Sequence, residues 1–163
     1  MLKKIISGGQ TGVDRAALDG AIAANFPYSG FCPKGRLCET GRIPEHYQLQ
    51  EAASAAYSVR TRLNVKNSDG TLILLASQIA TVGAGTLLTI SETKQTKKPL
   101  LIFYLDQNLS PAIVCDWLLK NHIQILNIAG PRESQSPGIY QQSYKFIKKL
   151  LLYNSATGTN IVR

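Results

Sequence analysis

Residues 3–24, KKIISGGQTGVDRAALDGAIAA, join a short apolar run to a helical pattern through a glycine-rich loop. Lys3 to Ser7 is expected to be a buried strand that stops at the glycines. From Val13 to Ala24 the apolar residues recur with the period of a helix. Similar strand and helix patterns alternate along the whole chain. We therefore predict an α/β fold with a Rossmann-like, doubly wound, mainly parallel sheet and helices on both faces.

The rest of the chain supplies four more strands and four more helices. The strands are expected at 28–32, 71–76, 100–105 and 123–129, and the helices at 57–67, 83–97, 110–121 and from 136–137 to about 152. Ser110 should cap its helix, with Pro111 at the first helical position. Residues 1–153 are predicted to form one ligand-binding domain, followed by a loose tail at 154–163.

Composition limits the classes of function. The 163 residues fit one domain, and 18 Lys+Arg against 10 Asp+Glu give a net charge of +8. This excess favours an anionic partner, although composition alone fits a solvated basic surface better. A nucleic-acid-binding module ranks last because no aromatic platform is interleaved with the basic residues. No apolar run reaches the ~18 residues of a membrane span, and no signal peptide is expected, so a cytoplasmic location is predicted.

Candidate metal ligands are scattered. Cys32, Cys38 and Cys115 have no close CxxC spacing, and His46 and His122 stand alone. A zinc site needs three or four convergent ligands. We therefore expect no metal held by protein side chains.

Ligands of such sheets bind beyond the carboxyl ends of the strands, which directs attention to the loops there. The first loop contains Gly8, Gly9, Gln10, Thr11 and Gly12. Its glycines allow a ligand close to the backbone, and the helix that follows offers unpaired N–H groups to a phosphate. It lacks the Lys-Ser/Thr pair of a Walker A loop. Its GGxxG spacing also argues against NAD as a cofactor.

Two basic loops are further candidates. Lys34 and Arg36 flank Gly35 just after a strand and are expected to close over the same anion, with an exposed basic loop as the alternative. After the last strand, the rigid turn at Gly130 is expected to direct Arg132 into the crevice.

Four other residues complete the predicted site or its alternatives. Glu133 is expected to orient Arg132 or to accept a hydrogen bond from a heterocycle, unless the two form only a weak surface pair. Gly85 and Thr86 open a second helix that could hold an anion, and Arg60 lies on a nearby helix.

Taken together, these motifs resemble a known family. The matching segments are SGGQTGVDRAALDGAI, GFCPKGR, GRIPEHY, YSVRTRLNV, SDGTLIL, GAGT and LNIAGPRESQSPGIY, within residues 7–140. They resemble the bacterial molybdenum-cofactor carrier family, Rossmann-like proteins related to the lonely-guy and lysine-decarboxylase-like superfamily. The resemblance implies a homo-oligomer that carries or stores molybdenum cofactor, a molybdopterin with a terminal phosphate. In that interpretation the backbone of residues 8–12 and 85–86 cradles the phosphate, the cations Lys34, Arg36, Arg60 and Arg132 neutralise it, and Gln10 and Glu133 contact polar edges.

The alternative is a nucleotide-metabolising hydrolase of the phosphoribohydrolase type. Lonely-guy enzymes carry a PGGxGTxxE motif whose acid takes part in cleavage of the N-glycosidic bond. Here Leu88 and Thr89 follow the matching glycine–threonine pair, and neither carries a carboxylate. Loss of an acid–base group typically costs about 10²-fold or more in rate. The sequence therefore favours binding over catalysis, unless Asp14 or Glu133 supplies the acid.

Overall fold

Five parallel strands form the central sheet of the computed structural model, which describes residues 1–159. Their order is β2-β1-β9-β7-β8, with bounds β1 Lys4–Ile6, β2 Tyr28–Ser29, β7 Gly70–Leu75, β8 Leu100–Tyr104 and β9 Ile125–Ala129. The central strand β9 pairs with β1 through Ile5 and Leu126, and with β7 through Leu72 and Ile128. All six residues of β7 are buried, which explains its continuous apolar sequence.

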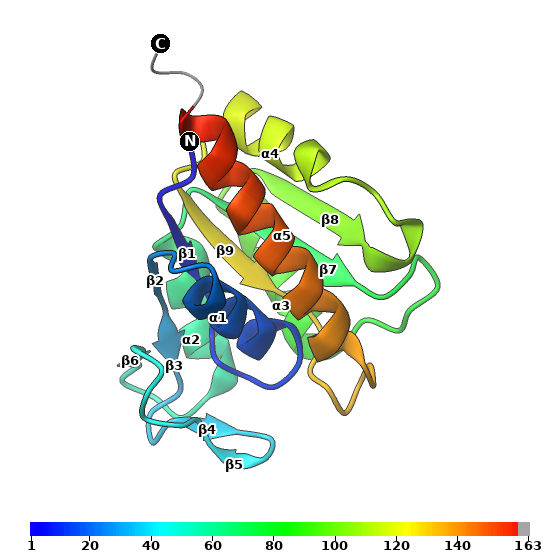
Figure 1. Cartoon of the computed structure of the whole chain (residues 1–163). Helices are drawn as coiled ribbons and strands as arrows, with labels where there is room; N and C mark the ends of the chain where they lie inside the picture. Colours follow the sequence, from blue (N-terminus) through cyan, green and yellow to red (C-terminus); the bar gives the residue numbers. More distant parts are fainter. Residues whose placement is uncertain (160–163) are drawn as a thin grey trace.

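Helices cover both faces of this sheet (Figure 1). On one face lie α1 (Val13–Ala23), α4 (Pro111–Lys120) and α5 (Ile139–Thr159), and on the other lie α2 (Tyr57–Lys66) and α3 (Ala84–Gln95). The larger part of the apolar core fills the space between the sheet and the first of these layers. The doubly wound Rossmann-like arrangement predicted from the sequence is confirmed.

The strand expected at 28–32 is broken at Gly30. Its first half, β2, stays in the central sheet, whereas β3 (Phe31–Cys32) leaves it and pairs in parallel with β6 (Gln50–Glu51). A Cβ atom on Gly30 would lie 1.9 Å from the carbonyl oxygen of Ser7. Only glycine allows the two backbones to approach this closely while the chain changes sheets.

The long loop after β3 is also more ordered than expected. It contains a small hairpin of β4 (Leu37–Cys38) and β5 (Gly41–Arg42), which projects beside the carboxyl edge of the sheet (Figure 1). The turn of this hairpin brings Glu39 against two of the loops at that edge, as described below.

The helix boundaries follow the sequence signals with one exception. A short 3-10 helix, η1 (Leu105–Gln107), precedes α4, and the Ser110 hydroxyl accepts a hydrogen bond from the Ala112 N–H at 3.2 Å, as the cap prediction required. The last helix, α5, runs to Thr159 instead of ending near residue 152. Asn154, expected in the loose tail, is buried, and its amide donates to the Leu2 carbonyl at 3.3 Å. Residues 160–163 of that tail lie outside the described residues.

Within residues 1–159, no helix combines the length and the apolar character needed to cross a membrane.

The Lys98 side chain closes the carboxyl end of α2. Its Nζ donates to the carbonyl oxygens of Val65, Lys66 and Ser68 at 2.9, 2.7 and 2.6 Å. The final carbonyls of a helix have no partner inside the helix, and a cation there also complements the helix dipole. Lys98 thus holds α2 to the turn that leads into β7.

We predict that Lys98→Met lowers the free energy of unfolding by about 1–3 kcal/mol, the range for hydrogen bonds to a charged group. Methionine keeps the apolar stem but removes all three donors. The matched control is Lys94→Met, an exposed change in the last turn of α3 that should cost about 0.3–1 kcal/mol. Urea unfolding of both variants measures the difference, and equal losses would contradict the capping role.

Candidate functional site

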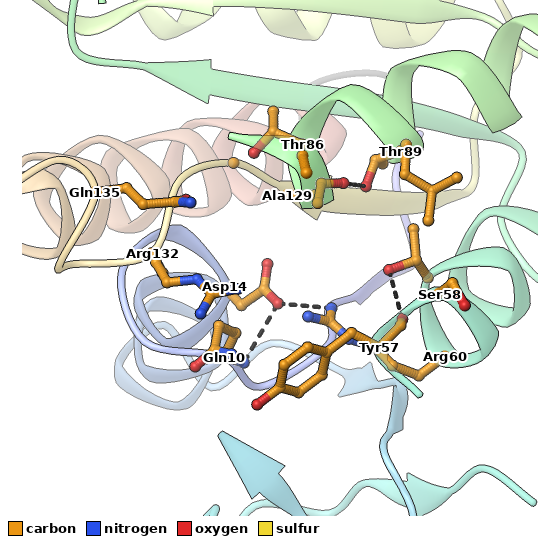
Figure 2. Close-up of a pocket in the computed structure, with 15 residues that line it drawn as sticks. Gln10, Asp14, Tyr57, Ser58, Arg60, Thr86, Thr89, Ala129, Arg132 and Gln135 are labelled. Atoms are coloured by element: carbon orange, nitrogen blue, oxygen red, sulfur yellow. Dashed lines mark hydrogen bonds and ion pairs between the residues drawn. The ribbon is translucent and has the colours of Figure 1, made fainter. Parts of the chain in front are cut away.

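A cavity of about 270 Å³ lies at the carboxyl edge of the sheet, where the loops after β1, β7 and β9 meet (Figure 2). This is the point at which the chain connections diverge to opposite sides of the sheet, the usual ligand position in doubly wound folds. Its lining comes from the first loop and α1, from α2, from α3, and from the segment after β9: Gln10, Asp14, Tyr57, Ser58, Arg60, Thr61, Ala84, Gly85, Thr86, Leu88, Thr89, Ala129, Gly130, Arg132 and Gln135.

A buried ion pair lies in the cavity wall. The Arg60 Nη1 atom is 3.0 Å from the Asp14 Oδ2 atom, and these side chains are 14% and 5% exposed. The same carboxylate oxygen accepts a hydrogen bond from the Gln10 N–H at 3.3 Å. The guanidinium lies directly over Gly8, where a Cβ atom would be 1.8 Å from Nη1. The glycine at this position therefore makes room for the arginine.

Burial raises the pKa of Asp14 above its ordinary value. The Arg60 charge and hydrogen bond act in the opposite direction, as does the Gln10 N–H, but the loss of hydration outweighs them. The cavity thus contains a carboxyl group that takes up a proton more readily than an exposed aspartate does.

The Gln10 side chain has a fixed orientation and a free donor. Its Oε1 accepts from the N–H of Thr11 at 3.0 Å and from the N–H of Glu39 at 2.9 Å, so this atom must be the oxygen. The Nε2 atom is buried, in a residue only 6% exposed, and has no partner among the described residues. The Nε atom of Arg60 is likewise buried without a partner there. Buried donors of this kind normally have an acceptor, so these two atoms are unusual features of residues that line the cavity.

The rim of the cavity combines an aromatic ring with a second cation. The Arg132 guanidinium carbon lies 5.7 Å from the centre of the Tyr57 ring, and that of Arg60 lies 5.9 Å from it. Arg132 remains 31% exposed, and its nearest carboxylate oxygen, on Glu39, is 3.9 Å away. The Arg132 guanidinium is therefore accessible to a ligand.

The amino end of α3 faces the same cavity. No side chain caps it, and a Cβ atom on Gly85 would meet nothing within 4 Å. Uncapped N–H groups at a helix start attract anions through both hydrogen bonding and the helix dipole. Thr86, one residue further on, is buried against the sheet.

The structure brings six of the predicted site residues together around the cavity: Gln10, Arg60, Gly85, Thr86, Gly130 and Arg132. Gly8 lies beneath Arg60, as described above. Gly9 faces away, against Ile43 and Leu49. Thr11 and Gly12 line a separate, shallower hollow on the other side of the first loop.

Lys34, Gly35 and Arg36 do not line the cavity. Arg36 is buried and donates to the carbonyl oxygens of Ile43, Pro44 and Tyr47 at 3.1, 2.8 and 3.0 Å. It organises the loop around itself instead of closing over an anion. Lys34 is exposed, and the Gly35 N–H is bonded to a glutamate in β6 at 2.6 Å.

Glu133 caps a helix instead of facing the cavity. Its carboxylate accepts from the N–H groups of Gly138 and Tyr140 at 2.5 and 2.9 Å, at the start of α5. A carboxylate at a helix amino end satisfies free N–H groups and complements the dipole. The expected pairing with Arg132 is not present, and Glu39 takes that position.

Several lining residues were not predicted from the sequence, and those with polar side chains are Tyr57, Ser58, Thr61 and Gln135. Tyr57 lies three residues before Arg60 in the same helix, and this spacing places both on one face. That signal was available. Nothing in the local sequence distinguishes Gln135, which reaches the cavity through the turn before α5.

Among residues 1–159, no group of three or more His, Cys, Asp and Glu side chains is arranged to hold a metal ion.

Glu39 links the hairpin turn to the loops that carry Gln10 and Arg132. Its carboxylate accepts hydrogen bonds from the hydroxyl groups of Thr11 and Ser134, and from the Ser134 N–H at 3.3 Å. Burial disfavours the charge, but the hydrogen bonds from Ser134 and Thr11, with the Arg132 charge, outweigh it and lower the pKa of Glu39. The ionised carboxylate is therefore the form that holds these loops together.

We predict that Glu39→Gln changes the pH dependence of stability. Because the pKa of Glu39 is lowered on folding, its ionised form stabilises the protein above the ordinary value of 4.5, and this contribution is lost as the pH falls through the folded value. The free-energy difference between wild type and variant should be largest at pH 6–7 and should shrink as the pH falls below 4.5. Urea unfolding across this range provides the measurement, and a difference that is independent of pH would exclude the ionised link.

Comparison with known proteins gives two matches. The model of the circularly permutated YpsA SLOG family matches residues 5–151. A crystal structure of a protein from Syntrophus aciditrophicus SB, provisionally named a molybdenum carrier protein, superposes with a TM-score of 0.85. The two sequences are 49% identical, and the match covers 92% of this chain and 95% of the other. No protein with a curated description matches. The chain belongs to the circularly permutated YpsA SLOG family.

Proposed function

We propose that the cavity binds a phosphorylated heterocycle. The observation that carries this proposal is the pair of buried donors without partners, Gln10 Nε2 and Arg60 Nε, in the lining of one cavity. Leaving a buried donor unpaired costs about 1–3 kcal/mol, and more for a charged group. A ligand that presents acceptor oxygen or nitrogen atoms at this wall recovers that cost.

The phosphate belongs at the amino end of α3, near Arg132. The uncapped N–H groups at Gly85 and Thr86 supply directed donors, and the Arg132 guanidinium supplies an accessible charge. Arg60 is a weaker candidate for neutralising the phosphate, since Asp14 already balances its charge.

The heterocycle belongs against Tyr57. This ring is partly exposed and lies within cation–π distance of both arginines, so one planar group can stack there while its edges meet polar side chains. A phosphate ion alone would leave the Tyr57 ring without a stacking partner.

Molybdenum cofactor is the cargo that we propose. Its pterin offers acceptor atoms on a planar ring system, and its terminal phosphate matches the amino end of α3, so the donors present here fit both ends. Support also comes from the 49% identical relative, which is provisionally named a molybdenum carrier protein. The bound cofactor would contribute its own metal chemistry, while this chain's part is to hold and shield it. A carrier or storage role needs binding and release but no reaction.

The rim cation should decide affinity. We predict that Arg132→Lys weakens binding of a pterin monophosphate by about 1–3 kcal/mol, because lysine cannot form the paired hydrogen bonds of a guanidinium. Lys34→Ala is the matched control, since this exposed residue lies outside the cavity. Its effect should be smaller and should shrink as salt rises.

Calorimetric titration of both variants at low and high salt tests this prediction. Equal losses at the two positions, or a loss only at Lys34, would place the ligand in a different loop and overturn the proposed site.

A phosphoribohydrolase is the second candidate, favoured by the Asp14 carboxyl in the cavity. This group is the one carboxylate in the lining described above, and its raised pKa suits an acid that protonates a leaving base. In that reaction the bond from the sugar carbon to the base would break and a bond to water would form. The proton of Asp14 would go to the departing nitrogen, and the proton that the water loses would return to Asp14.

We expect no turnover of nucleoside 5′-monophosphates at the ~1–10³ s⁻¹ of ordinary enzymes. The reason is that the residues at the position of the catalytic acid, Leu88 and Thr89, carry no carboxylate. Release of free base from AMP, followed by chromatography, is the assay. Turnover at an ordinary rate that disappears in Asp14→Asn would replace the carrier proposal with the hydrolase.

A further inference from the structure

Asp14 is unusual among the cavity residues because it carries negative charge into a site built from donors. Of the lining residues within the described part of the chain, it is the single carboxylate. Its side chain is 5% exposed, so water cannot screen it effectively. An anionic ligand in this cavity must therefore come close to a buried negative charge.

We propose that Asp14 holds the anionic part of the ligand as the neutral acid, so that anion binding in this cavity takes up one proton. The inference rests on the proposed function in one respect, namely that an anion occupies the cavity. It adds a ligand-binding residue and couples binding to pH.

The shared arginine is the first argument. Arg60 bonds Asp14 through Nη1, and its Nε is buried without a partner among the described residues. An anion in the cavity would bring a second negative charge close to the same guanidinium, because Asp14 and Arg60 both line it. Two like charges that share a buried site raise the pKa of one of them strongly, as in paired carboxylates.

The surroundings of Asp14 offer little to oppose protonation. The charged groups in the same lining are Arg60 from α2 and Arg132 from the segment after β9. The stretch of α3 that lines the cavity, residues 84–89, contributes no ionisable side chain. From its own loop, Asp14 meets the Gln10 N–H and the Ser7 hydroxyl. Burial already raises the pKa of Asp14 before any anion arrives.

The proton also has a use once it is bound. A neutral carboxylic acid has one O–H donor, whereas the carboxylate only accepts. The protonated side chain can donate to an oxygen of the anion, and such O–H···O⁻ bonds are among the short, strong ones. Uptake of a proton thereby turns a repulsive contact into a hydrogen bond and releases the Arg60 charge for the ligand.

Sulfate is the probe of choice, because its own charge does not change between pH 5 and 8. Titration calorimetry in buffers of different ionisation enthalpy gives the number of protons taken up on binding. We expect close to one proton at pH values above the pKa of Asp14. Linkage then requires the affinity to rise by up to about 10-fold for each unit by which the pH falls.

Two variants assign the proton. Asp14→Asn keeps the size of the side chain but cannot titrate, so it should bind sulfate with no uptake from the cavity and with little dependence on pH. Asp19→Asn is the matched control, because Asp19 lies outside the cavity and accepts from the Tyr47 and Tyr140 hydroxyls at 2.7 Å each. Proton uptake in this variant should equal that of the wild type.

The outcomes separate the two proposals. Sulfate binding by the wild type without proton uptake at any pH from 5 to 8 overturns the role of Asp14 and leaves the anion site standing. Proton uptake that persists in Asp14→Asn shows that another group takes up the proton, and this result also overturns the role of Asp14. Failure of the wild type to bind sulfate, or binding that is unaffected by Gln10→Leu and Arg132→Lys, contradicts the proposed function itself. If Asp14→Asn does not fold, Arg60→Gln replaces it in the test. Proton uptake that is lost in Arg60→Gln and kept in Asp19→Asn supports the role of Asp14, and uptake that persists in Arg60→Gln overturns it.

Discussion

The ion pair between Asp14 and Arg60 is the contact on which the cavity depends. It joins the start of α1 to the middle of α2 across 46 positions of sequence, and it is possible because Gly8 leaves space for the guanidinium. Removing one member of a buried pair typically costs about 3–5 kcal/mol, since the other charge stays buried. The pair also leaves the buried Arg60 Nε without a partner among the described residues, so the contact that fixes the wall keeps one donor unused.

A second set of contacts aligns the remaining donors with this pair. The Glu39 backbone fixes the amide of Gln10, and its carboxylate ties the first loop to Ser134, two residues after Arg132. The hairpin thus fixes the positions of loops that line the cavity, although it does not line the cavity itself. Donors that are held in place before binding lose little conformational entropy when the ligand arrives, which favours affinity. The rigid parts of the site are its buried donors, and the adaptable part is the rim.

Local patterns made the fold predictable and directed attention to part of the cavity lining. A strand, a glycine loop and a helix follow from spacing alone, so the sheet was predicted correctly, and the predicted residues Gln10, Gly85 and Thr86 do line one cavity. Arg36 and Arg132 show the limit, because each follows a glycine after a strand. Arg36 turns inward because the carbonyls of residues 43–47 fold around it, whereas Arg132 reaches the cavity. The difference depends on whether a later segment of the chain folds back over the arginine. The spacing of apolar residues along the sequence carries no information about such contacts. Glu39 was missed for the same reason.

The distribution of charge suits a protein that must both capture and release its ligand. At the buried end of the cavity, Asp14 already balances Arg60, so binding there depends on matching acceptors to fixed donors and gives selectivity more than strength. At the rim, Arg132 is partly exposed, rests near the Tyr57 ring and has only a distant carboxylate at 3.9 Å. An exposed charge accelerates the approach of an anion but holds it weakly in salt. A site whose selective donors are buried and whose accessible charge lies at the entrance can therefore discriminate between ligands without binding them irreversibly.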